Sequence, residues 1–265
     1  MFVLGLYSWG IAYIEMEYLK LSSDNQLKNV SLLHNLLGFA ISMLLVFRTN
    51  TAYDRWWEGR KLWGALVNNS RNLALKLNSI LPQDDEKNRS FFRQLIPRFA
   101  LELKNHLQSE ETRLALDENL HPEIQHFDRN KHVLAQVSSL LMNRINLMYR
   151  QQQISGEQLI FLNTELQSFM EVCGACERIK NTPIPYSYSA FIKKFIFIYV
   201  VTLPVGYVFN LGYLIIPVVI FVFYVLASLE LIAEEIEDPF GRDANDLPMQ
   251  RIADTIKKNV QDILS

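Results

Sequence analysis

Residues 30–47 read VSLLHNLLGFAISMLLVF and run directly into RTNTAYDRWW at residues 48–57. The apolar part is close to the length of about 20 residues that crosses a bilayer as a helix. Phe39, Met43 and Phe47 recur at intervals of four, so in a helix they stack on one side over about 12 Å. A stripe of this kind usually packs against lipid or a neighbouring helix, although hydrophobic constrictions that gate a pore by dewetting have the same composition. The stretch therefore predicts a membrane helix whose apolar face serves packing or lines a pore.

Three further stretches are candidates for membrane spans, at residues 1–18, 190–209 and 211–233. The first is interrupted by Glu15 and Glu17, and its uncharged part is short for a span, so we expect the natural protein to have a further segment before residue 1. The last two are adjacent, and the turn that contains Asn210 and Gly212 is expected to join them into a hairpin, because both residue types tolerate unusual backbone angles. A buried hairpin of a soluble protein is the alternative, but two long, nearly uncharged runs favour the membrane.

The positions of basic residues predict the orientation of these spans. The residues that flank the second and third spans on one side are Arg48, Arg55, Arg60, Lys61, Lys193 and Lys194. By the positive-inside rule these flanks face the cytoplasm, which places residues 48–189 there as a large helical region. With four spans, the N-terminus and residues 234–265 lie in the cytoplasm as well. We therefore expect a multi-pass protein of the inner (plasma) membrane, with the lipid bilayer as a partner.

Composition excludes several other classes of protein. The chain has 265 residues and a formal net charge of −2, so it offers no overall basic field for nucleic acid. It contains no phosphate-binding loop, dinucleotide fingerprint or nucleophile elbow, and we predict no catalytic residue and no enzymatic activity. The polar regions show helical spacing and no strand alternation. The sequence therefore predicts an all-α protein.

The two cysteines, Cys173 and Cys176, invite a zinc or redox interpretation. A tetrahedral zinc site needs four ligands, and the histidines, at positions 34, 106, 121, 126 and 132, show no partner spacing. Cysteines one helical turn apart are more often buried apolar residues. We therefore predict no metal site and no cofactor.

Three stretches stand out as motifs: FRTNTAYDRWWEGRKLW at residues 47–63, CGACERIKNTPIPY at residues 173–186 and EEIEDPFG at residues 234–241. Together they resemble the signature sequences of the bestrophin family, and of its prokaryotic members in particular, in the family's order and over nearly the whole chain. The residues that are most specific to the family's signature sequences are Asp54, Arg55, Trp56, Trp57, Pro183 and Pro185. We expect a structural role for them, since Arg55 can bind carboxylates bidentately and tryptophan rings can anchor at the membrane boundary.

The resemblance implies a homopentameric ion channel, formed by a single domain over residues 1–265. Five copies of the second span would surround one axial pore, and each copy would point three apolar residues inward as a narrow neck. Counting back from Asp54, these positions fall on Phe39, Met43 and Phe47, which are the residues of the apolar stripe.

The resemblance also implies a cytoplasmic vestibule with a second narrowing at its exit. Gap-free alignment places this aperture on Glu157, whereas a one- or three-residue gap brings Ile154 or Ile160 there instead. A ring of Glu157 side chains would attract cations and repel anions. A solvated glutamate in the first turn of a helix is the ordinary alternative.

The acidic segment after the last span departs from the eukaryotic pattern that the resemblance implies. Animal bestrophins bind calcium there with a run of carboxylates, but here Ile236 and Pro239 stand where ligands would be expected. Ca²⁺ takes six to eight oxygen ligands, so Glu235, Glu237 and Asp238 supply a weak surface site at most. We predict no calcium gating of the eukaryotic kind.

The predicted function is passive conduction of monovalent ions, with Na⁺ favoured over anions because of Glu157 and the acidic segment. A chloride channel of the same architecture is the alternative, and a non-conducting scaffold or a redox sensor is an alternative of a different class. A transporter also stays open, because Pro204 and Pro217 interrupt the third and fourth spans. His34 and Asn35, polar residues inside the second span, either pack in the core or face the extracellular mouth of the pore.

Overall fold

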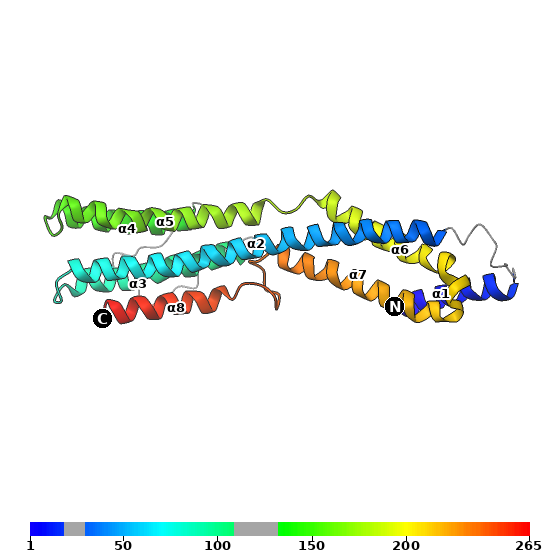
Figure 1. Cartoon of the computed structure of the whole chain (residues 1–265). Helices are drawn as coiled ribbons and strands as arrows, with labels where there is room; N and C mark the ends of the chain where they lie inside the picture. The colour runs from blue at the N-terminus through cyan, green and yellow to red at the C-terminus, as the bar shows by residue number, and fades with distance from the viewer. Residues whose placement is uncertain (19–29, 109–131) are drawn as a thin grey trace. The chain divides into compact units, whose positions relative to one another are not determined.

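The computed structural model describes residues 1–18, 30–108 and 132–265 (Figure 1). The elements in these ranges are α1 (Phe2–Tyr13), the π-helical turn η1 (Ile14–Tyr18), α2 (Val30–Ile80), α3 (Glu86–Gln108), α4 (Val133–Arg150), α5 (Gly156–Asn181), α6 (Tyr186–Leu211), the 3₁₀ turn η3 (Gly212–Leu214), α7 (Ile215–Glu237) and α8 (Met249–Ile263). The described ranges contain no strand, which confirms the all-α prediction for them. His121 and His126 lie outside the described residues.

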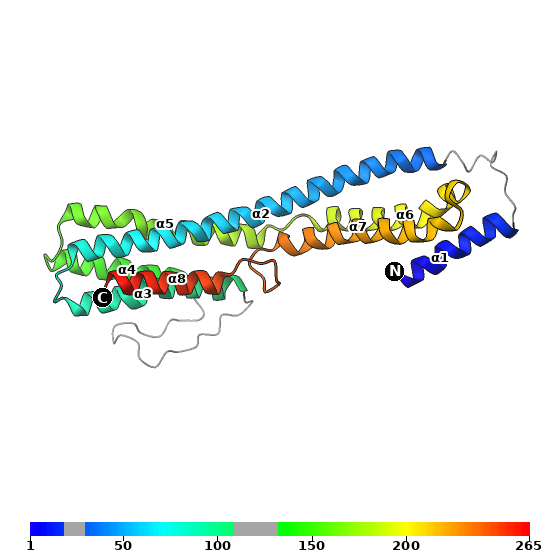
Figure 2. The same ribbon diagram turned by 60° about the horizontal axis from the view of Figure 1, so that its bottom comes forward.

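Helix α2 is longer than the sequence predicted. The predicted span ends at Phe47, whereas α2 continues unbroken to Ile80 (Figure 2). No proline interrupts it, and the hydroxyl groups of Thr49 and Thr51 donate to backbone carbonyls of the preceding turn, so the polar residues do not disturb the helix. The change from apolar to polar sequence therefore leaves the backbone of α2 regular.

Prolines do not break the helices of the third and fourth spans. Pro204 lies inside α6, which continues to Leu211, and Pro217 lies in the first turn of α7, where its missing N–H is not needed. Pro97 is likewise accommodated inside α3. The prediction that Pro204 and Pro217 interrupt these helices is therefore wrong. Paired broken helices, which are typical of a transporter, are not found among the described residues.

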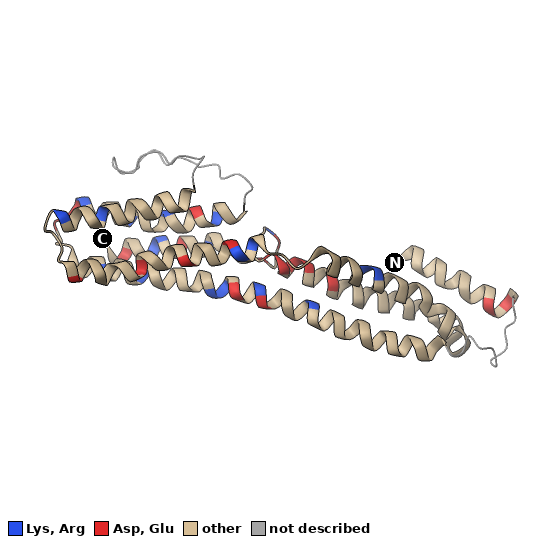
Figure 3. Cartoon of the chain, turned by 90° about the horizontal axis from the view of Figure 1, so that it is seen from above, with Lys and Arg blue, Asp and Glu red and all other residues tan. Residues whose placement is uncertain are grey.

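Within the described residues, two helical segments are long and apolar enough to cross a membrane, by length and composition. They are Val30–Ile80 and Tyr186–Glu237, and the second contains both α6 and α7. Helix α1 has 12 residues, which is shorter than a span needs. Charged residues are sparse along α1, α6 and the first part of α2, and frequent along α3, α5 and α8 (Figure 3). The number of spans stays a prediction.

The chain divides into two compact units, of which the first comprises Met1–Asp54 and Pro183–Glu237. Within it, α6 and α7 pack against each other and α1 contacts both. Its buried apolar residues are Ala12, Ile41, Leu45, Ile192, Ile196, Val200, Leu203, Val208, Ile215 and Val219. Each of its long helices therefore buries one stripe of side chains and leaves further apolar side chains exposed within the described part of this unit.

The second unit comprises Arg55–Thr182 and Asp238–Ser265. Helix α3 contacts α4, α5 and α8, and α4 contacts α5. The large side chains of Trp63, Phe92, Phe99, Phe169 and Phe240 are fully buried in its core. The predicted single domain over residues 1–265 stays a prediction.

The hairpin between α6 and α7 turns at Gly212, as the sequence predicted, whereas the expected turn residue Asn210 lies in the last turn of α6. Its backbone angles are φ +53° and ψ −137°, a conformation that is essentially restricted to glycine because any Cβ clashes with the backbone. The turn therefore depends on this residue.

We expect Gly212→Ala to destabilise the protein by about 1–3 kcal/mol, because alanine cannot adopt this conformation without strain. Thermal unfolding of the purified protein in detergent measures the effect. Gly10→Ala is the matched control, since a Cβ at Gly10 would have no neighbour within 4 Å. Equal melting temperatures for the two variants would contradict the assignment.

Candidate functional site

The predicted neck residues lie on a face of α2 that its own unit does not cover. The side chains of Phe39, Met43 and Phe47 are 65%, 44% and 57% exposed, whereas Ile41 and Leu45 on the same helix are 1% and 3% exposed. Helix α2 therefore buries one face in its unit and presents a second apolar face outward. An apolar surface of this kind requires lipid, another protein surface or a pore to cover it.

His34 is packed inside its unit rather than on that outward face. Its side chain is 2% exposed, Nε2 lies 3.0 Å from the hydroxyl oxygen of Thr202 on α6, and Nδ1 lies 3.2 Å from the carbonyl oxygen of Val30. The hydroxyl of Tyr207 donates to Oδ1 of Asn35 at 2.7 Å. Polar side chains of α2 and α6 thus satisfy one another, which favours the packing interpretation of His34.

Arg48 is the buried charge at the end of the apolar stretch. It is 1% exposed, and its Nη2 lies 2.6 Å from Oε2 of Glu237, while its Nε lies 3.7 Å from Oε1 of Glu230. The other oxygen of Glu237 accepts a hydrogen bond from the backbone N–H of Ile184 at 2.7 Å. These contacts tie α2, the end of α7 and the segment before α6 together within one unit.

The contacts of the acidic segment indicate that it stabilises the fold rather than binds an ion. The carboxylate of Glu237 faces Arg48, and Asp238 accepts a hydrogen bond from the N–H of Phe240 at 3.3 Å, while Glu235 is exposed. The sequence did not connect Glu237 with Arg48, because 189 residues separate them. The structure assigns Glu237 to a buried ion pair.

Arg55, from the specific part of the first motif, binds backbone carbonyls at the end of α5. Its guanidinium donates to the carbonyl oxygens of Thr182 at 2.6 Å and Ile179 at 2.7 Å. The last carbonyls of a helix have no partner within the helix, so Arg55 satisfies two of them. Pro183 follows directly, and Pro185 precedes the first residue of α6, so the two prolines separate the helices.

The neighbouring tryptophans differ in what they contact. The indole N–H of Trp56 donates to the carbonyl oxygen of Asn245 at 2.9 Å, within the second unit. Its ring stacks against that of Trp57, which is 46% exposed, and Asp54 is exposed as well. Trp56 therefore holds the segment before α8, while Trp57 and Asp54 are available to other surfaces.

The predicted aperture residues lie at the start of α5 and beside it. Glu157 is exposed in the first turn, and the hydroxyl of Ser155 donates to its Oε2 at 2.7 Å, a hydrogen bond that lowers the pKa of this carboxyl below its usual value. Ile160 is 74% exposed, whereas Ile154 is 5% exposed in the core of its unit. Glu157 therefore carries a negative charge at neutral pH, and Ile154 is enclosed by its own chain.

The cysteines on α5 are free and fully buried, as the sequence predicted. Burial, with the negative charge of Glu177 as a second cause, raises the pKa of Cys173 well above its usual range and that of Cys176 to about 12. The thiolate is the reactive form of cysteine, so both thiols are inert at neutral pH. This environment argues against a redox sensor.

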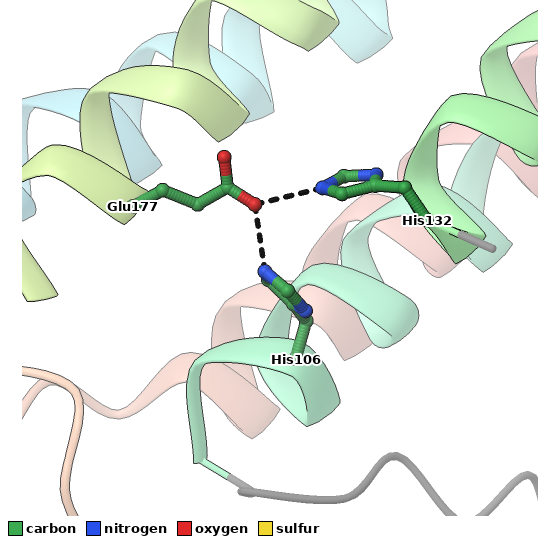
Figure 4. Close-up of side chains that lie close together, drawn as sticks. All are labelled: His106, His132 and Glu177. Atoms are coloured by element: carbon green, nitrogen blue, oxygen red, sulfur yellow. Dashed lines mark hydrogen bonds and ion pairs between the residues drawn. The ribbon is translucent and has the colours of Figure 1, made fainter. Parts of the chain in front are cut away.

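Three side chains from different helices converge in the second unit, and the sequence missed them (Figure 4). Oε1 of Glu177 lies 2.7 Å from Nε2 of His106 and 2.8 Å from Nε2 of His132, and the two imidazole rings are 5.2 Å apart. Although burial raises the pKa of Glu177, the hydrogen bonds from both histidines lower it overall. The expectation that no histidine has a partner is therefore wrong for His106 and His132, since packing of α3, α4 and α5 brings together residues 45 and 71 positions apart.

Comparison with known proteins places the chain in a family. The sequence profile described as "Bacterial/Fungal Bestrophin protein" matches residues 1–262. The chain belongs to the bestrophin family. This confirms the resemblance carried by the three motifs.

Relatives of known name and structure support the same assignment. The voltage-dependent anion channel-forming protein alr2987 of Nostoc sp. is 38% identical over 235 residues, which cover 86% of this chain and 76% of the relative. The voltage-dependent anion channel-forming protein YneE of Escherichia coli is 33% identical over 224 residues, or 84% and 73% of the two chains. A bacterial bestrophin homologue from Klebsiella pneumoniae has the same fold, with a TM-score of 0.87, 27% identity and coverage of 99% and 97%. The bestrophin chain described here is thus related to channel-forming membrane proteins.

We expect Arg48→Met to destabilise the protein by about 3–5 kcal/mol, because it leaves the carboxylates of Glu230 and Glu237 without their cation. Chemical or thermal unfolding in detergent measures the loss. Lys193→Met is the control, since its ion pair with Glu234 is 47% and 51% exposed and contributes little. A loss no larger than that of the control would contradict a stabilising role for Arg48.

Proposed function

We propose that this bestrophin is one subunit of a homopentameric ion channel of the inner membrane, with the pore on the symmetry axis. The observation that carries the proposal is the outward apolar face of α2, on which Phe39, Met43 and Phe47 are exposed while Ile41 and Leu45 are buried. One chain contributes only one copy of this face of α2 and cannot enclose a pore with it, so several copies arranged around an axis are required. Four spans, a cytoplasmic region over residues 48–189, and cytoplasmic termini complete the proposed topology.

In the proposed channel the three side chains form a hydrophobic neck. An apolar constriction excludes water when it is narrow, and ions cross it only when it is wide or wet. The neck thus sets the conductance and the gating, and it carries no charge that distinguishes cations from anions.

Replacing Phe39, Met43 and Phe47 together by alanine should raise ion flux, by at least about tenfold, because smaller side chains leave a wider constriction that stays hydrated. A flux assay in proteoliposomes measures this. Phe221→Ala, which truncates a 65% exposed aromatic side chain on α7, is the control and should leave flux unchanged. Unchanged flux in the triple variant would refute the neck assignment.

The permeant ion is proposed to be a monovalent anion such as chloride. The curated relatives that support this are named anion channel-forming proteins, and their names give no support to the preference for Na⁺ drawn from the sequence. A cation channel is the second candidate, and the observation that favours it is the ionised and exposed Glu157 in the first turn of α5. Gating by calcium is not part of the proposal, since Glu237 is engaged by Arg48.

A reversal-potential measurement in planar bilayers with asymmetric NaCl separates the two candidates. We expect the reversal potential to lie near the equilibrium potential of chloride. Glu157→Gln should shift the reversal potential further toward that value if Glu157 lines the aperture. Glu171→Gln removes another exposed carboxylate of α5 and should leave it unchanged. A potential on the sodium side would overturn the anion proposal, and no current at all would favour a scaffold.

A further inference from the structure

We infer that His106, His132 and Glu177 form a binding site for a divalent transition-metal ion, with Zn²⁺ as the ion that fits its donor set best (Figure 4). The site lies in the second unit, where α3 supplies His106 near its C-terminal end, His132 precedes the first residue of α4, and α5 supplies Glu177. It is separate from the residues proposed to line the pore, and the inference does not rest on the proposed channel function.

The donor atoms are placed close enough for one ion to bind all three. The two Nε2 atoms and the carboxylate oxygen lie within 4.8 Å of one another. Zinc binds imidazole nitrogen at about 2.0–2.1 Å and carboxylate oxygen at about 2.0–2.2 Å, so tetrahedral ligands are about 3.4 Å apart. The present N···O distances of 2.7 and 2.8 Å are hydrogen-bond lengths, and the ion would separate the carboxylate from the rings by roughly half an ångström.

The side chains can make this adjustment, and an ion can reach them. His106, His132 and Glu177 are 36%, 38% and 28% exposed, so none is locked in the core. With neutral rings the three ligands carry one negative charge, which favours a divalent cation. Two imidazoles with one carboxylate suit zinc and other first-row transition metals, whereas Ca²⁺ and Mg²⁺ prefer oxygen ligands.

One neighbouring positive charge opposes the ion, and the neighbouring thiols do not bind it. The ammonium group of Lys180 donates to the carbonyl oxygen of His106 at 3.1 Å, which places a positive charge near the site. Burial keeps the thiols of Cys173 and Cys176 protonated, so the CGAC motif supplies no thiolate ligand.

Binding requires both imidazoles to release the Nε2 proton that each donates to Glu177, and it costs His132 a further hydrogen bond. The N–H of Ala135 donates to Nδ1 of His132 at 3.1 Å, so the neutral ring carries its proton on Nε2 and donates it to Glu177. When zinc binds Nε2, that proton moves to Nδ1 and the hydrogen bond that caps α4 is lost. The loss of such a cap weakens binding by roughly fivefold, which leaves a three-ligand site with useful affinity.

Isothermal titration of the full chain in detergent with ZnCl₂, after removal of any histidine tag, tests the inference. We expect about one zinc ion per subunit, with an affinity at least about tenfold weaker in His106→Gln and in Glu177→Gln. Glu171→Gln, on the same helix, is the control and should bind as the unmodified chain does. Zinc should also raise the melting temperature of the unmodified chain and not that of Glu177→Gln, since only a binding-competent folded state is stabilised.

The inference fails if zinc does not bind at micromolar concentration, which would leave the three residues as a hydrogen-bonded cluster only. It also fails if His106→Gln and Glu177→Gln bind zinc as tightly as the unmodified chain does. A double variant, Cys173→Ala with Cys176→Ala, should retain binding, and its loss there would assign the ion to the thiols instead. Should one variant fail to fold, His132→Gln provides the same comparison at the third ligand.

Discussion

Helix α2 carries an apolar sequence and then a polar one along a single unbroken helix of 51 residues. In an apolar surrounding every backbone group must be bonded within the chain, and a continuous helix meets this demand. Side chains then decide what each part contacts. Ile41 and Leu45 pack into the first unit, while Phe39, Met43 and Phe47 stay outside it. The oligomer, the pore and the neck proposed for this bestrophin all follow from that uncovered face.

Charged groups at the ends of helices are used mainly to hold segments in place. Arg48, buried beside Glu237 and Glu230, cannot be replaced by an uncharged residue without leaving carboxylates unpaired. Arg55 serves the end of α5 by binding carbonyls that have no partner in the helix. Among the motif residues, Arg55, Trp56 and Glu237 therefore have structural contacts within the chain. The acidic segment shows this most clearly, since its Glu237 is engaged on both oxygens.

A short stretch of α5 in the second unit contains two buried, unreactive thiols and one partly exposed carboxylate. Cys173 and Cys176 face the core, where burial keeps both thiols protonated. Glu177, one turn further, faces two imidazoles and is partly exposed. The same helix thus buries two thiols and presents a partly exposed carboxylate. Cys176 and Glu177 are neighbours in the sequence and point in different directions around the helix, so one can be buried while the next is partly exposed.

The all-α class, the apolar stretches, the family and the turn at Gly212 could be predicted from the sequence, because each depends on local composition, spacing or a specific motif. The sequence also marked Phe39, Met43 and Phe47, since an interval of four fixes a shared helical face whatever the surroundings. The folded chain was needed to show that this face is exposed, that Ile154 is enclosed, and that Pro204 and Pro217 are accommodated. It alone joined Arg48 to Glu237 and brought His106 and His132 to Glu177. These contacts depend on how helices pack, and the packing of side chains separated by 45 to 189 residues leaves no periodic trace in the sequence.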